Sequence, residues 1–355
     1  MIIHIISSIK GGGAEIIVQE LHKIYLNKNL NSYVIYFTGD DTKLSNNETV
    51  LNLSHKNPFL IFYLRKVIKK LMKKTKKNII IHVHLTWPFF YTAFAVLGLK
   101  NVKLIFTEHA ISNRRRKIPF LKFIERLFYS RYSSIVCISK GVYKSLAKWV
   151  GNKIQKRLVT IPNGSRIFTL PKRTSLKKRL PRLISVGSLI YEKNFSTTIK
   201  SISKIKDDIE NYTIIGEGPE RKKLEEMIIN LKLKNKVKLI GWSDKIEKYL
   251  HNSDIQLLPS LAEGFGLVAV EGMSTGLPII ASNIEGLNEV LGPESSFITL
   301  IDQVDSPDEW KKAIYKVIND IHILGNIKIS KLAKQQAKKF TFKKMAKSYL
   351  EVYYK

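Results

Sequence analysis

Short apolar stretches, glycine-containing loops and helical segments follow one another along almost the whole of this chain. Near the beginning, the sequence predicts a strand over Ile2–Ser7, a loop at Gly11–Gly13 and a helix over residues 14–25. The second half starts again in the same way, with a predicted strand over Arg182–Val186 and a loop over Gly187–Asn194 ahead of a helix. This alternation is typical of parallel sheets whose connecting helices cover both faces. We therefore predict an α/β protein with two parallel sheets.

Loops that follow the predicted strands hold most of the candidate functional residues. The further predicted strands are Asn78–Val83, Val102–Thr107, Ser134–Ser139, Val159–Pro162, Tyr212–Ile215, Lys236–Ile240 and Ile255–Leu258. Ligands of parallel sheets bind outside the carboxyl ends of the strands, so the residues just after these strands are the ones to consider. They include Gly12, Gly13, His109, Gly187–Asn194, Gly216, Gly218, Gly241 and Glu263–Gly266.

The length of 355 residues is enough for two domains, each with its own hydrophobic core. The stretch from Ser165 to Pro181 is rich in Lys, Arg, Ser and Thr and contains Pro171, so we interpret it as the linker. A last helix is predicted over Phe342–Tyr353. The single cysteine, Cys137, excludes an internal disulfide and fits a reducing compartment.

Positive charge is concentrated in one part of the chain. Residues 51–200 contain 33 Lys and Arg but 3 Asp and Glu, which gives +30 of the total net charge of +31. Residues 201–300 have 11 basic and 15 acidic residues, a net charge of −4. Such a polarised chain indicates an anionic partner: a membrane surface, a lipid-linked phosphate or a nucleic acid.

Two basic amphipathic stretches, residues 56–74 and 114–129, lie within this positive region. Aromatic and aliphatic residues on one face with Lys and Arg on the other are typical of helices that lie at a membrane interface. We assign contact with a membrane or an acceptor to Lys69, Lys70, Arg114, Arg115, Arg116 and Lys117. Ordinary domain helices with solvated basic faces are the alternative.

The sequence predicts neither a secretion signal nor a membrane span. The first residues lack the basic region and cleavage site of a signal peptide. The longest apolar stretch, Trp87–Leu99, is too short to cross a bilayer and contains Pro88. We expect a cytoplasmic protein, peripheral on the inner face of the plasma membrane.

Two carboxylates eight positions apart, Glu263 and Glu271, mark the most informative segment. Glu263 follows a predicted strand, and Glu271 falls in a helix with almost no polar face. A carboxylate in such a helix costs several kcal/mol unless a backbone N–H group, a cation or the hydroxyls of a ligand pair with it.

Other motifs are less specific. Gly11–Gly13 opens a helix as phosphate-binding loops do, but the third glycine of the dinucleotide fingerprint is missing, and a plain turn is the alternative. His109 ends a strand, where it is suited to donate to a substrate hydroxyl or to make a structural hydrogen bond. His82 and His84 face the same side of a strand, but no third metal ligand is evident nearby, so we interpret both as structural.

In their order along the chain, these motifs resemble glycosyltransferase family 4, a retaining family with the two-domain GT-B fold. The resemblance covers nearly the whole chain and rests on the first glycine loop, Thr107–His109, Ile161–Gly164, Val186–Asn194, Ile215–Pro219 and Pro259–Pro278. It implies two Rossmann-like domains that face each other across a cleft. The N-terminal, acceptor-binding domain would span residues 1–168, and the nucleotide-sugar-binding domain residues 180–339. The helix over 340–355 would cross back to the N-terminal domain.

The resemblance also implies roles for individual residues. Glu271 would hold the ribose hydroxyls of a UDP- or GDP-sugar, and Glu263 would contact the donor sugar or the reacting centre. Lys193 would neutralise the diphosphate as it leaves, and His109 would hydrogen-bond to the donor sugar. The further donor-binding residues would be Gly12, Gly13, Ser188, Asn194, Gly216, Gly218, Gly241, Phe265, Gly266, Leu267 and Val268. The resemblance implies no metal and no other cofactor, because protein cations and helix dipoles supply the positive charge.

Two positions depart from the family's pattern. Many members have Arg where this chain has Ser188, and many have an acidic residue shortly after Asn163-Gly164, where Ser165-Arg166 follow here. Both departures concern the surroundings of the donor.

The predicted function is therefore a retaining transfer of a sugar from a UDP- or GDP-sugar to a lipid-linked or envelope glycan, with an anionic membrane surface as a partner. A nucleotide-sugar epimerase or a phosphorylase on the same fold is an alternative, because both would use a similar nucleotide or sugar site. A basic nucleic-acid-binding protein would explain the charge, but it would not explain a carboxylate in a buried helix.

Overall fold

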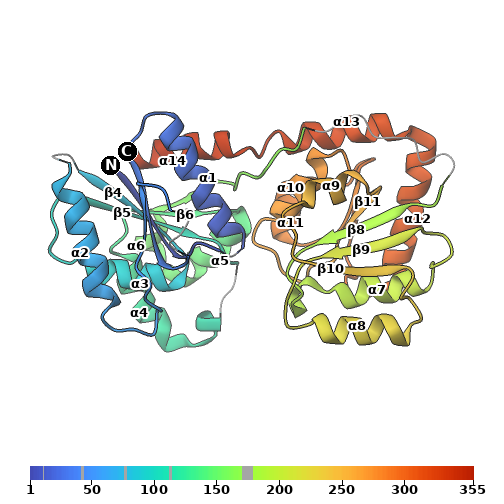
Figure 1. Ribbon diagram of the computed structural model, residues 1–355, viewed down its shortest axis with the longest axis horizontal. Helices are drawn as coiled ribbons and strands as arrows, with labels where there is room; N and C mark the ends of the chain where they lie inside the picture. The colour runs from blue at the N-terminus through green and yellow to red at the C-terminus, as the bar shows by residue number, and fades with distance from the viewer. Residues whose placement is uncertain (11, 41–43, 76–77, 112–113, 170–178) are drawn as a thin grey trace. The chain divides into compact units, whose positions relative to one another are not determined.

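The structure, a computed structural model, describes residues 1–10, 12–40, 44–75, 78–111, 114–169 and 179–355. The chain divides into two compact units (Figure 1). Unit 1 comprises Met1–Gly164 and Phe342–Lys355, and unit 2 comprises Ser165–Thr341. Each unit has its own sheet, and every strand pairing within the two sheets is parallel. The expectation of an α/β fold with two parallel sheets is confirmed.

The sheet of unit 1 has seven strands in the order β3-β2-β1-β4-β5-β6-β7. The strands are β1 (Ile2–Ser8), β2 (Ser32–Thr38), β3 (Glu48–Val50), β4 (Ile79–His84), β5 (Val102–Glu108), β6 (Ser134–Cys137) and β7 (Leu158–Thr160). Strands β2 and β3 extend the sheet from β1 in one direction, and β4 to β7 extend it in the other. The sheet therefore has a topological switch point between β1 and β4, which is where ligands of such sheets bind.

Helices cover both faces of this sheet. They are α1 (Gly13–Asn27), α2 (Leu60–Lys73), α3 (Thr86–Ala95), α4 (Pro119–Tyr129), α5 (Lys140–Val150), α6 (Asn152–Gln155) and α14 (Phe342–Tyr354). Figure 1 shows α1 and α14 on one side of the sheet and α3 and α4 on the other. The Tyr25 hydroxyl of α1 donates to the Ala346 carbonyl oxygen of α14 at 3.3 Å. The expectation that the last helix returns to the first domain is thus confirmed.

The sheet of unit 2 has six strands in the order β10-β9-β8-β11-β12-β13. The strands are β8 (Arg182–Val186), β9 (Asn211–Ile215), β10 (Val237–Gly241), β11 (Ile255–Leu258), β12 (Ile279–Ser282) and β13 (Ile298–Ile301). As in unit 1, the order of the strands reverses once, here between β8 and β11. The second switch point therefore lies at the carboxyl ends of these two strands.

The helices of unit 2 are α7 (Phe195–Ser203), α8 (Arg221–Asn230), α9 (Ile246–His251), α10 (Leu267–Ser274), α11 (Glu285–Leu291), α12 (Pro307–Leu324) and α13 (Asn326–Ala337). Figure 1 shows α7 and α8 on one face of the sheet and α9, α10 and α11 on the other. Local sequence sets several of the helix ends. The Ser306 hydroxyl accepts from the Glu309 N–H group at the start of α12, and Gly325 ends that helix with φ 77°.

The first residues of the expected linker belong to unit 2. The Ser165 hydroxyl donates to the Leu267 carbonyl oxygen at 3.2 Å, and the Phe168 N–H group donates to the Ser274 hydroxyl at 3.0 Å. These bonds attach the segment after Gly164 to helix α10, so unit 1 ends four residues before the expected position 168. Residues 170–178 of the expected linker lie outside the described residues.

No helix in the described part of the chain combines the length and the apolar character needed to cross a bilayer. Trp87–Leu99, the longest apolar stretch, forms most of α3 and the turn that follows it.

Candidate active site

Three loops join at the switch point of unit 2. They follow β8, β9 and β11, which are neighbours in the sheet. The Leu189 N–H group donates to the Glu217 carbonyl oxygen at 2.9 Å, and the Leu261 N–H group donates to the Glu192 carbonyl oxygen at 2.8 Å. The predicted grouping of these loops at one edge of the sheet is therefore present.

Two glycines allow the loops after β8 and β9 to pack this closely. A Cβ atom on Gly216 would lie 1.9 Å from the Gly187 carbonyl oxygen, and one on Gly218 would lie 2.4 Å from the Leu189 carbonyl oxygen. Both contacts are with backbone, which cannot move aside cheaply. Gly241 also takes part, since its carbonyl oxygen accepts from the Gly216 N–H group at 2.9 Å. These three residues shape the site, whatever they contact in a ligand.

Lys193 and Glu263 form an ion pair across two of these loops. Each side chain is 19% exposed, so the pair is partly shielded from water. We assigned the two residues to different parts of a donor, and the structure shows that they are also partners of each other. A ligand that binds here meets a lysine whose charge is already balanced by a carboxylate.

Helix α10 begins without a side-chain cap. Gly266 precedes it in the left-handed conformation, with φ 81°, and no side chain caps the helix start. The N–H groups of Leu267 and Val268 belong to the first turn, where a helix provides no carbonyl partner. Their direction and the helix dipole make this end suited to a phosphate.

Glu271 lies one turn further along α10 and is 6% exposed. Burial raises the pKa of its carboxyl group to about 7, and the positive charge of Arg166 opposes this shift. Glu271 is therefore a buried acid with the cation Arg166 nearby, and its carboxylate is suited to accept from ligand hydroxyls.

Arg166 has a role near Glu271 that the sequence did not reveal, since there it was only a departure from the family pattern. Its neighbour Ser165 bonds to the Leu267 carbonyl oxygen, which places this segment beside the start of α10. Its side chain is half-buried, and its charge acts on Glu271. Ser188 is exposed and carries no charge. The positive charge on this side of unit 2 that Ser188 does not provide comes from Arg166.

Gly286, at the start of α11, fixes the Glu263 loop and was not identified from the sequence. A Cβ atom there would lie 1.8 Å from the Glu263 carbonyl oxygen. The side chain of the next residue, Leu287, lies 2.6 Å from the position of a Cβ atom on Gly266. Helix α11 thus supports both ends of the loop that holds Glu263.

Two residues expected at the donor site have other tasks in the structure. The Asn194 amide donates to the Val304 carbonyl oxygen and to Asp305, both at 3.2 Å, and accepts from the Thr197 hydroxyl at 2.8 Å. Its backbone is left-handed, with φ 51°, which Asn tolerates well. Phe265 is 2% exposed and packs against Phe340, with ring centroids 5.6 Å apart. These side chains hold the loops in place, and the assignment of both residues to the donor site stays a prediction.

Gly12, Gly13 and His109 lie at the carboxyl ends of β1 and β5 in unit 1. Gly13 begins α1, and a Cβ atom on Gly12 would meet no atom within 4 Å among the described residues, which leaves room for a ligand. His109 is half-buried, and burial lowers its pKa to about 4. Its Nε2 atom lies 3.3 Å from Nδ1 of His84.

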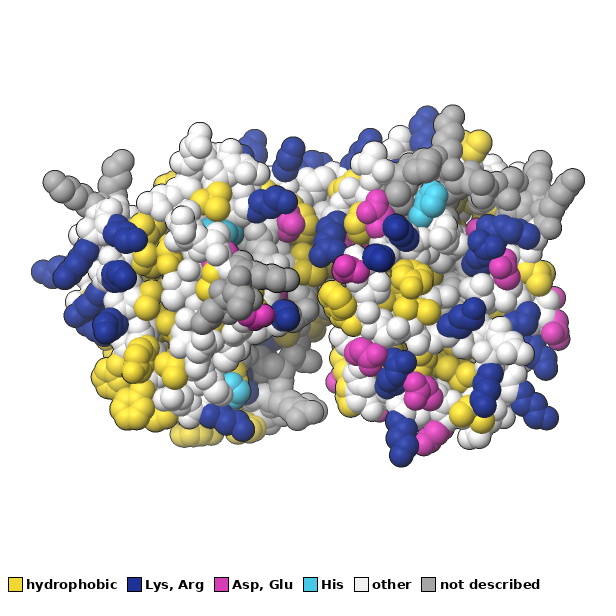
Figure 2. Space-filling model, in the orientation of Figure 1, with side chains coloured by type: hydrophobic (Ala, Val, Ile, Leu, Met, Phe, Trp, Pro, Cys, Tyr) yellow, Lys and Arg dark blue, Asp and Glu magenta, His cyan; other side chains and the backbone are white. Residues whose placement is uncertain are grey.

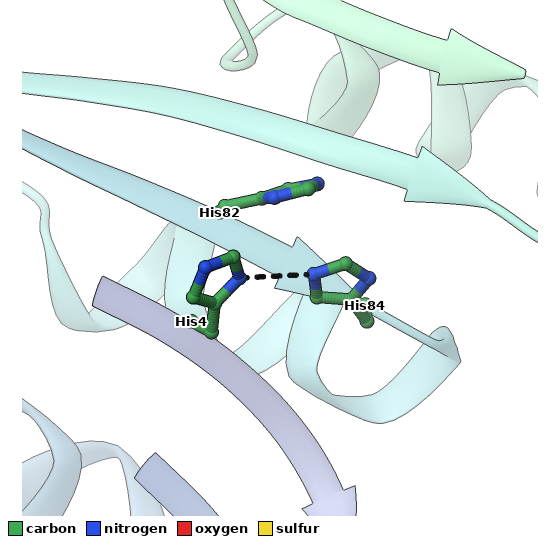
Figure 3. Close-up of side chains that lie close together, drawn as sticks. All are labelled: His4, His82 and His84. Carbon is green, nitrogen blue, oxygen red and sulfur yellow. Dashed lines mark hydrogen bonds between the residues drawn. The ribbon is translucent and has the colours of Figure 1, made fainter. Parts of the chain in front are cut away.

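A third imidazole, His4, lies beside His82 and His84, contrary to the expectation that no third ligand is near (Figure 3). Parallel pairing of β1 with β4 places His4 directly opposite His82. Candidate ligand atoms of the three rings lie within 4.8 Å of one another. However, His82 already bonds to the Tyr353 hydroxyl at 2.6 Å and to the Thr107 hydroxyl at 2.7 Å. Since both of its ring nitrogens are engaged, the group does not fit a three-histidine metal site.

The expected basic cluster at residues 114–117 is also corrected in part. Arg116 is 8% exposed and forms a 2.7 Å ion pair with Glu108, and Arg115 forms a 2.9 Å ion pair with Glu125. These guanidinium groups hold the segment before α4 against the unit and are not available to a membrane. The side chains of Arg114 and Lys117 lie outside the described residues. Lys69 and Lys70 are exposed on α2, as expected.

Two Rossmann-like units, with a last helix that returns to the first, define the GT-B class of glycosyltransferases. Two family profiles match the chain: the one described as Glycosyltransferase Family 4 over residues 11–165, and the one described as Glycosyl transferases group 1 over residues 167–340. The chain belongs to glycosyltransferase family 4.

Individual relatives agree with this assignment. Glycosyltransferase MJ1178 of Methanocaldococcus jannaschii is 24% identical, and the match covers 96% of this chain and 94% of that protein. The UDP-Gal:alpha-D-GlcNAc-diphosphoundecaprenol alpha-1,3-galactosyltransferase of Escherichia coli is 28% identical over 47% of this chain and 40% of that protein. Among solved structures, Anabaena Alr3699/HepE in complex with UDP and glucose has a TM-score of 0.81 and 19% identity, with coverage of 99% of this chain and 98% of that one.

Proposed function

We propose that this glycosyltransferase is a retaining enzyme that moves a sugar from a UDP- or GDP-sugar to an acceptor hydroxyl. The proposal is carried by the grouping, at the switch point of unit 2, of buried Glu271, the open start of α10 and the Lys193–Glu263 pair. These groups suit the successive parts of a nucleotide-sugar. The solved structures of Alr3699/HepE with UDP and with UDP-glucose support a donor of this class.

The nucleotide would be held in unit 2. Glu271 accepts hydrogen bonds from the two ribose hydroxyls, which offset the cost of burying its carboxylate. The N–H groups of Leu267 and Val268 bind the diphosphate, and Lys193 and Arg166 balance its charge. With these cations and the dipole of α10 in place, we propose that no metal ion is required.

The chemical step is a substitution at the anomeric carbon. The bond from this carbon to the diphosphate oxygen breaks, and the electron pair leaves with the diphosphate. The acceptor oxygen forms its new bond on the same face, and its proton passes to an oxygen of the departing diphosphate. Lys193 and the α10 N–H groups stabilise the charge that develops on the leaving group. Glu263 contacts the donor sugar and holds Lys193, and His109 hydrogen-bonds to a sugar hydroxyl.

For the acceptor we propose a lipid-linked or envelope glycan. The names of two relatives support this class: the diphosphoundecaprenol galactosyltransferase of Escherichia coli and a lipopolysaccharide core biosynthesis glycosyltransferase of Rhizobium meliloti. Such acceptors are attached to a membrane, so the enzyme would work at its inner face.

One surface of unit 1 has the character that this location requires. Helices α2, α3 and α4 lie next to one another and carry large exposed apolar side chains. These are Phe59, Phe62, Tyr63, Trp87, Phe94, Leu97, Ile118, Phe120, Phe123 and Leu127. Figure 2 shows hydrophobic side chains gathered at the lower left of unit 1, with Lys and Arg side chains beside them. We call this surface the α2–α4 face.

A shallow basic groove on α2 borders the α2–α4 face. Its volume is about 490 Å³, and its lining residues are Phe62, Arg65, Lys66, Lys69, Lys70 and Lys73. Each basic residue near an anionic bilayer contributes about 1 kcal/mol of attraction. Exposed Phe120 and Phe123, which are 72% and 78% exposed, would insert among the acyl chains.

The donor is tested with purified protein, a panel of UDP- and GDP-sugars and a membrane extract from the source cells. We expect one donor to bind and to release its nucleotide together with a glycosylated product. If no donor in the panel binds or turns over, the proposed function is wrong. Release of UDP without any glycosylated acceptor would instead favour an epimerase.

The α2–α4 face is tested by sedimentation with phosphatidylglycerol vesicles at low salt. We expect the protein to sediment with these vesicles and a Phe120→Asp/Phe123→Asp variant to remain in solution. The matched control is Ile323→Asp/Ile327→Asp, which changes two equally exposed apolar residues in unit 2. If the wild-type protein stays in solution, or if both variants lose binding equally, this face is not the membrane contact.

A further inference from the structure

Three imidazoles in unit 1 form a continuous chain that ends at His109. They come from neighbouring strands: His4 from β1, His84 from β4, and His109 from the position after β5. Nδ1 of His4 lies 3.4 Å from Nε2 of His84, and Nδ1 of His84 lies 3.3 Å from Nε2 of His109. Figure 3 shows the rings of His4 and His84 pointing toward one another, while His82 lies on the same strand as His84 but apart from this contact.

Burial of the three rings favours the neutral form of each imidazole. Burial lowers the pKa of His4 to about 3 and that of His109 to about 4, and it lowers the pKa of His84 as well. A neutral imidazole has one N–H group and one nitrogen that accepts. Each contact in the chain therefore needs a donor on one ring and an acceptor on the other.

This requirement links the tautomers of the three rings. If His84 carries its proton on Nδ1, it donates to Nε2 of His109, and His109 must then carry its own proton on Nδ1. In the same arrangement, Nε2 of His84 accepts from Nδ1 of His4. If His84 carries its proton on Nε2, all three rings change together, and Nδ1 of His109 becomes an acceptor.

The end of the imidazole chain at His4 distinguishes the two tautomeric arrangements. Nε2 of His4 is buried and has no hydrogen-bond partner in the described part of the chain. Among backbone groups, a buried donor without an acceptor is rarer than an under-used acceptor, and we extend this preference to the ring nitrogen of His4. The arrangement in which His4 Nε2 is a bare acceptor, with its proton on Nδ1, is therefore favoured.

We propose that His84, with His4 behind it, is a positioning residue that holds His109 in the tautomer that presents an Nδ1–H donor to the ligand. His109 then donates to a substrate oxygen such as a sugar hydroxyl, and the orientation of its ring is fixed by the bond to His84. A second tautomer at His109 would offer a lone pair in place of the donor.

The backbone next to His84 supports a fixed ring. Leu85 directly follows His84 and has φ 68° and ψ 167°, a conformation that costs a residue with a side chain on the order of 1–3 kcal/mol. Its side chain packs with Ile6 and Val18, so the surrounding core holds this strained turn in place. The end of β4 is therefore a rigid support for His84.

The tautomers are measured by two-bond ¹H–¹⁵N correlation spectra of the ¹⁵N-labelled protein. For the wild type we expect His109 to show the Nδ1–H tautomer. His4→Phe keeps a ring in the core but removes the partner of His84, so we expect both tautomers of His109 to be populated. The His22→Gln variant is the control, because His22 is also buried in unit 1 and acts on the charge of His4, but it bonds to Ser32 and makes no hydrogen bond to the imidazole chain. An Nε2–H tautomer in the wild type, or an unchanged His109 spectrum in His4→Phe, would overturn the proposal.

A kinetic test rests on the proposed function and uses the donor that the panel identifies. We expect His84→Phe to lower kcat/KM for that donor about fivefold to twentyfold, the effect of one poorly placed hydrogen bond. Binding of UDP alone should not change, since it depends on Glu271 and α10. Equal loss of UDP binding, or a melting temperature far below that of His22→Gln, would show a general structural role instead.

The spectroscopic test and the kinetic test can each give a negative result without the other. The spectra need no turnover, so a protein that uses no nucleotide-sugar still shows whether His4 sets the tautomer of His109. Metal analysis of the purified protein provides one more outcome. If about one zinc per chain is bound and is lost in His4→Phe, a metal site replaces the proposed imidazole chain.

Discussion

The switch points of unit 1 and unit 2 have the same strand topology but are lined by different kinds of side chains. In unit 2, the space beside β8 and β11 is surrounded by charged groups: the Lys193–Glu263 pair, Glu271 and Arg166. In unit 1, His4, His82 and His84 lie beside each other on β1 and β4, and burial lowers the pKa of each. Similar backbones thus provide one site suited to a charged ligand part and one suited to hydroxyl groups. The fold gives the positions, and the side chains at the strand ends decide the ligand.

The charged site of unit 2 is tested most strongly by replacing Lys193. We expect Lys193→Ala to lower kcat by about a hundredfold to a thousandfold, because the leaving diphosphate loses its nearest cation. The matched control is Lys204→Ala, which removes an exposed ion pair with Asp308 elsewhere in unit 2. Steady-state kinetics with the donor from the panel measures both. Equal rates for the two variants would mean that Lys193 has no part in the chemical step.

A substitution at Gly286 tests whether turnover depends on the position of the loop that holds Glu263. Gly286→Ala should lower turnover by about a hundredfold, because a Cβ atom 1.8 Å from the Glu263 carbonyl oxygen must displace the loop. Gly325→Ala is the control: its φ of 77° is also unfavourable for Ala, but no described atom lies within 4 Å of the new Cβ atom. Full activity of a folded Gly286→Ala enzyme would show that the loop tolerates the shift.

The raised pKa of Glu271 predicts that UDP binding to unit 2 depends on pH, in contrast to the histidine site of unit 1. Burial raises its pKa from 4.5 to about 7, and ribose hydroxyls need the ionised form as acceptor. UDP should therefore bind about tenfold more tightly at pH 8 than at pH 6, beyond the change due to the phosphate itself. Calorimetry measures this, and Glu271→Gln should remove the difference. The same slope in the variant would mean that another group titrates.

The same pKa shift has a consequence for stability. Well below pH 4.5, Glu271 is largely protonated in the folded and in the unfolded protein, so Glu271→Gln should change the melting temperature little. As pH rises from 4.5 to 7, the unfolded state ionises first and is favoured, and the cost approaches about 3 kcal/mol above pH 7. Glu271→Gln should therefore melt at a higher temperature than the wild type at pH 8. A variant that melts lower at pH 8 would show that the carboxylate has a partner in the protein.

Arg166 gives the smallest expected effect. Arg166→Ala should weaken UDP binding about fivefold, the amount expected for one partly exposed cation near a diphosphate. The loss should shrink at high salt, since screening weakens such interactions. Arg182→Ala, which breaks an exposed ion pair with Glu210, is the control. If both variants bind UDP as the wild type does, Lys193 and the α10 N–H groups balance the diphosphate without Arg166.

Local sequence patterns were sufficient for much of the fold and for the charged site. The strands before the glycine loops are apolar and short, and a helix without a polar face, such as α10, must be buried, so Glu271 could be identified. The same patterns could not show that Asn194 bonds to Val304 or that Phe265 packs against Phe340. An asparagine at a left-handed helix cap and a phenylalanine in the core look, in sequence, like residues beside a ligand.

Other residues depend on contacts between distant segments. His4 meets His84 only because β1 pairs with β4, and no spacing in the sequence shows which strands are neighbours. Gly286 matters because α11 approaches the Glu263 loop, and Arg116 is removed from the surface by Glu108. The first is a hydrogen bond between strands, the second a packing effect and the third an ion pair, and none leaves a local signal.

Helix α14 gives unit 1 a different order of assembly from unit 2. Unit 2 is a single continuous stretch, so it is complete once Thr341 has been synthesised. Unit 1 still lacks the hydroxyls of Tyr349 and Tyr353, which bond to Thr107 and to His82 in its core. The core of unit 1 therefore joins segments from far apart in the sequence, and it can be completed only after α14 has been synthesised.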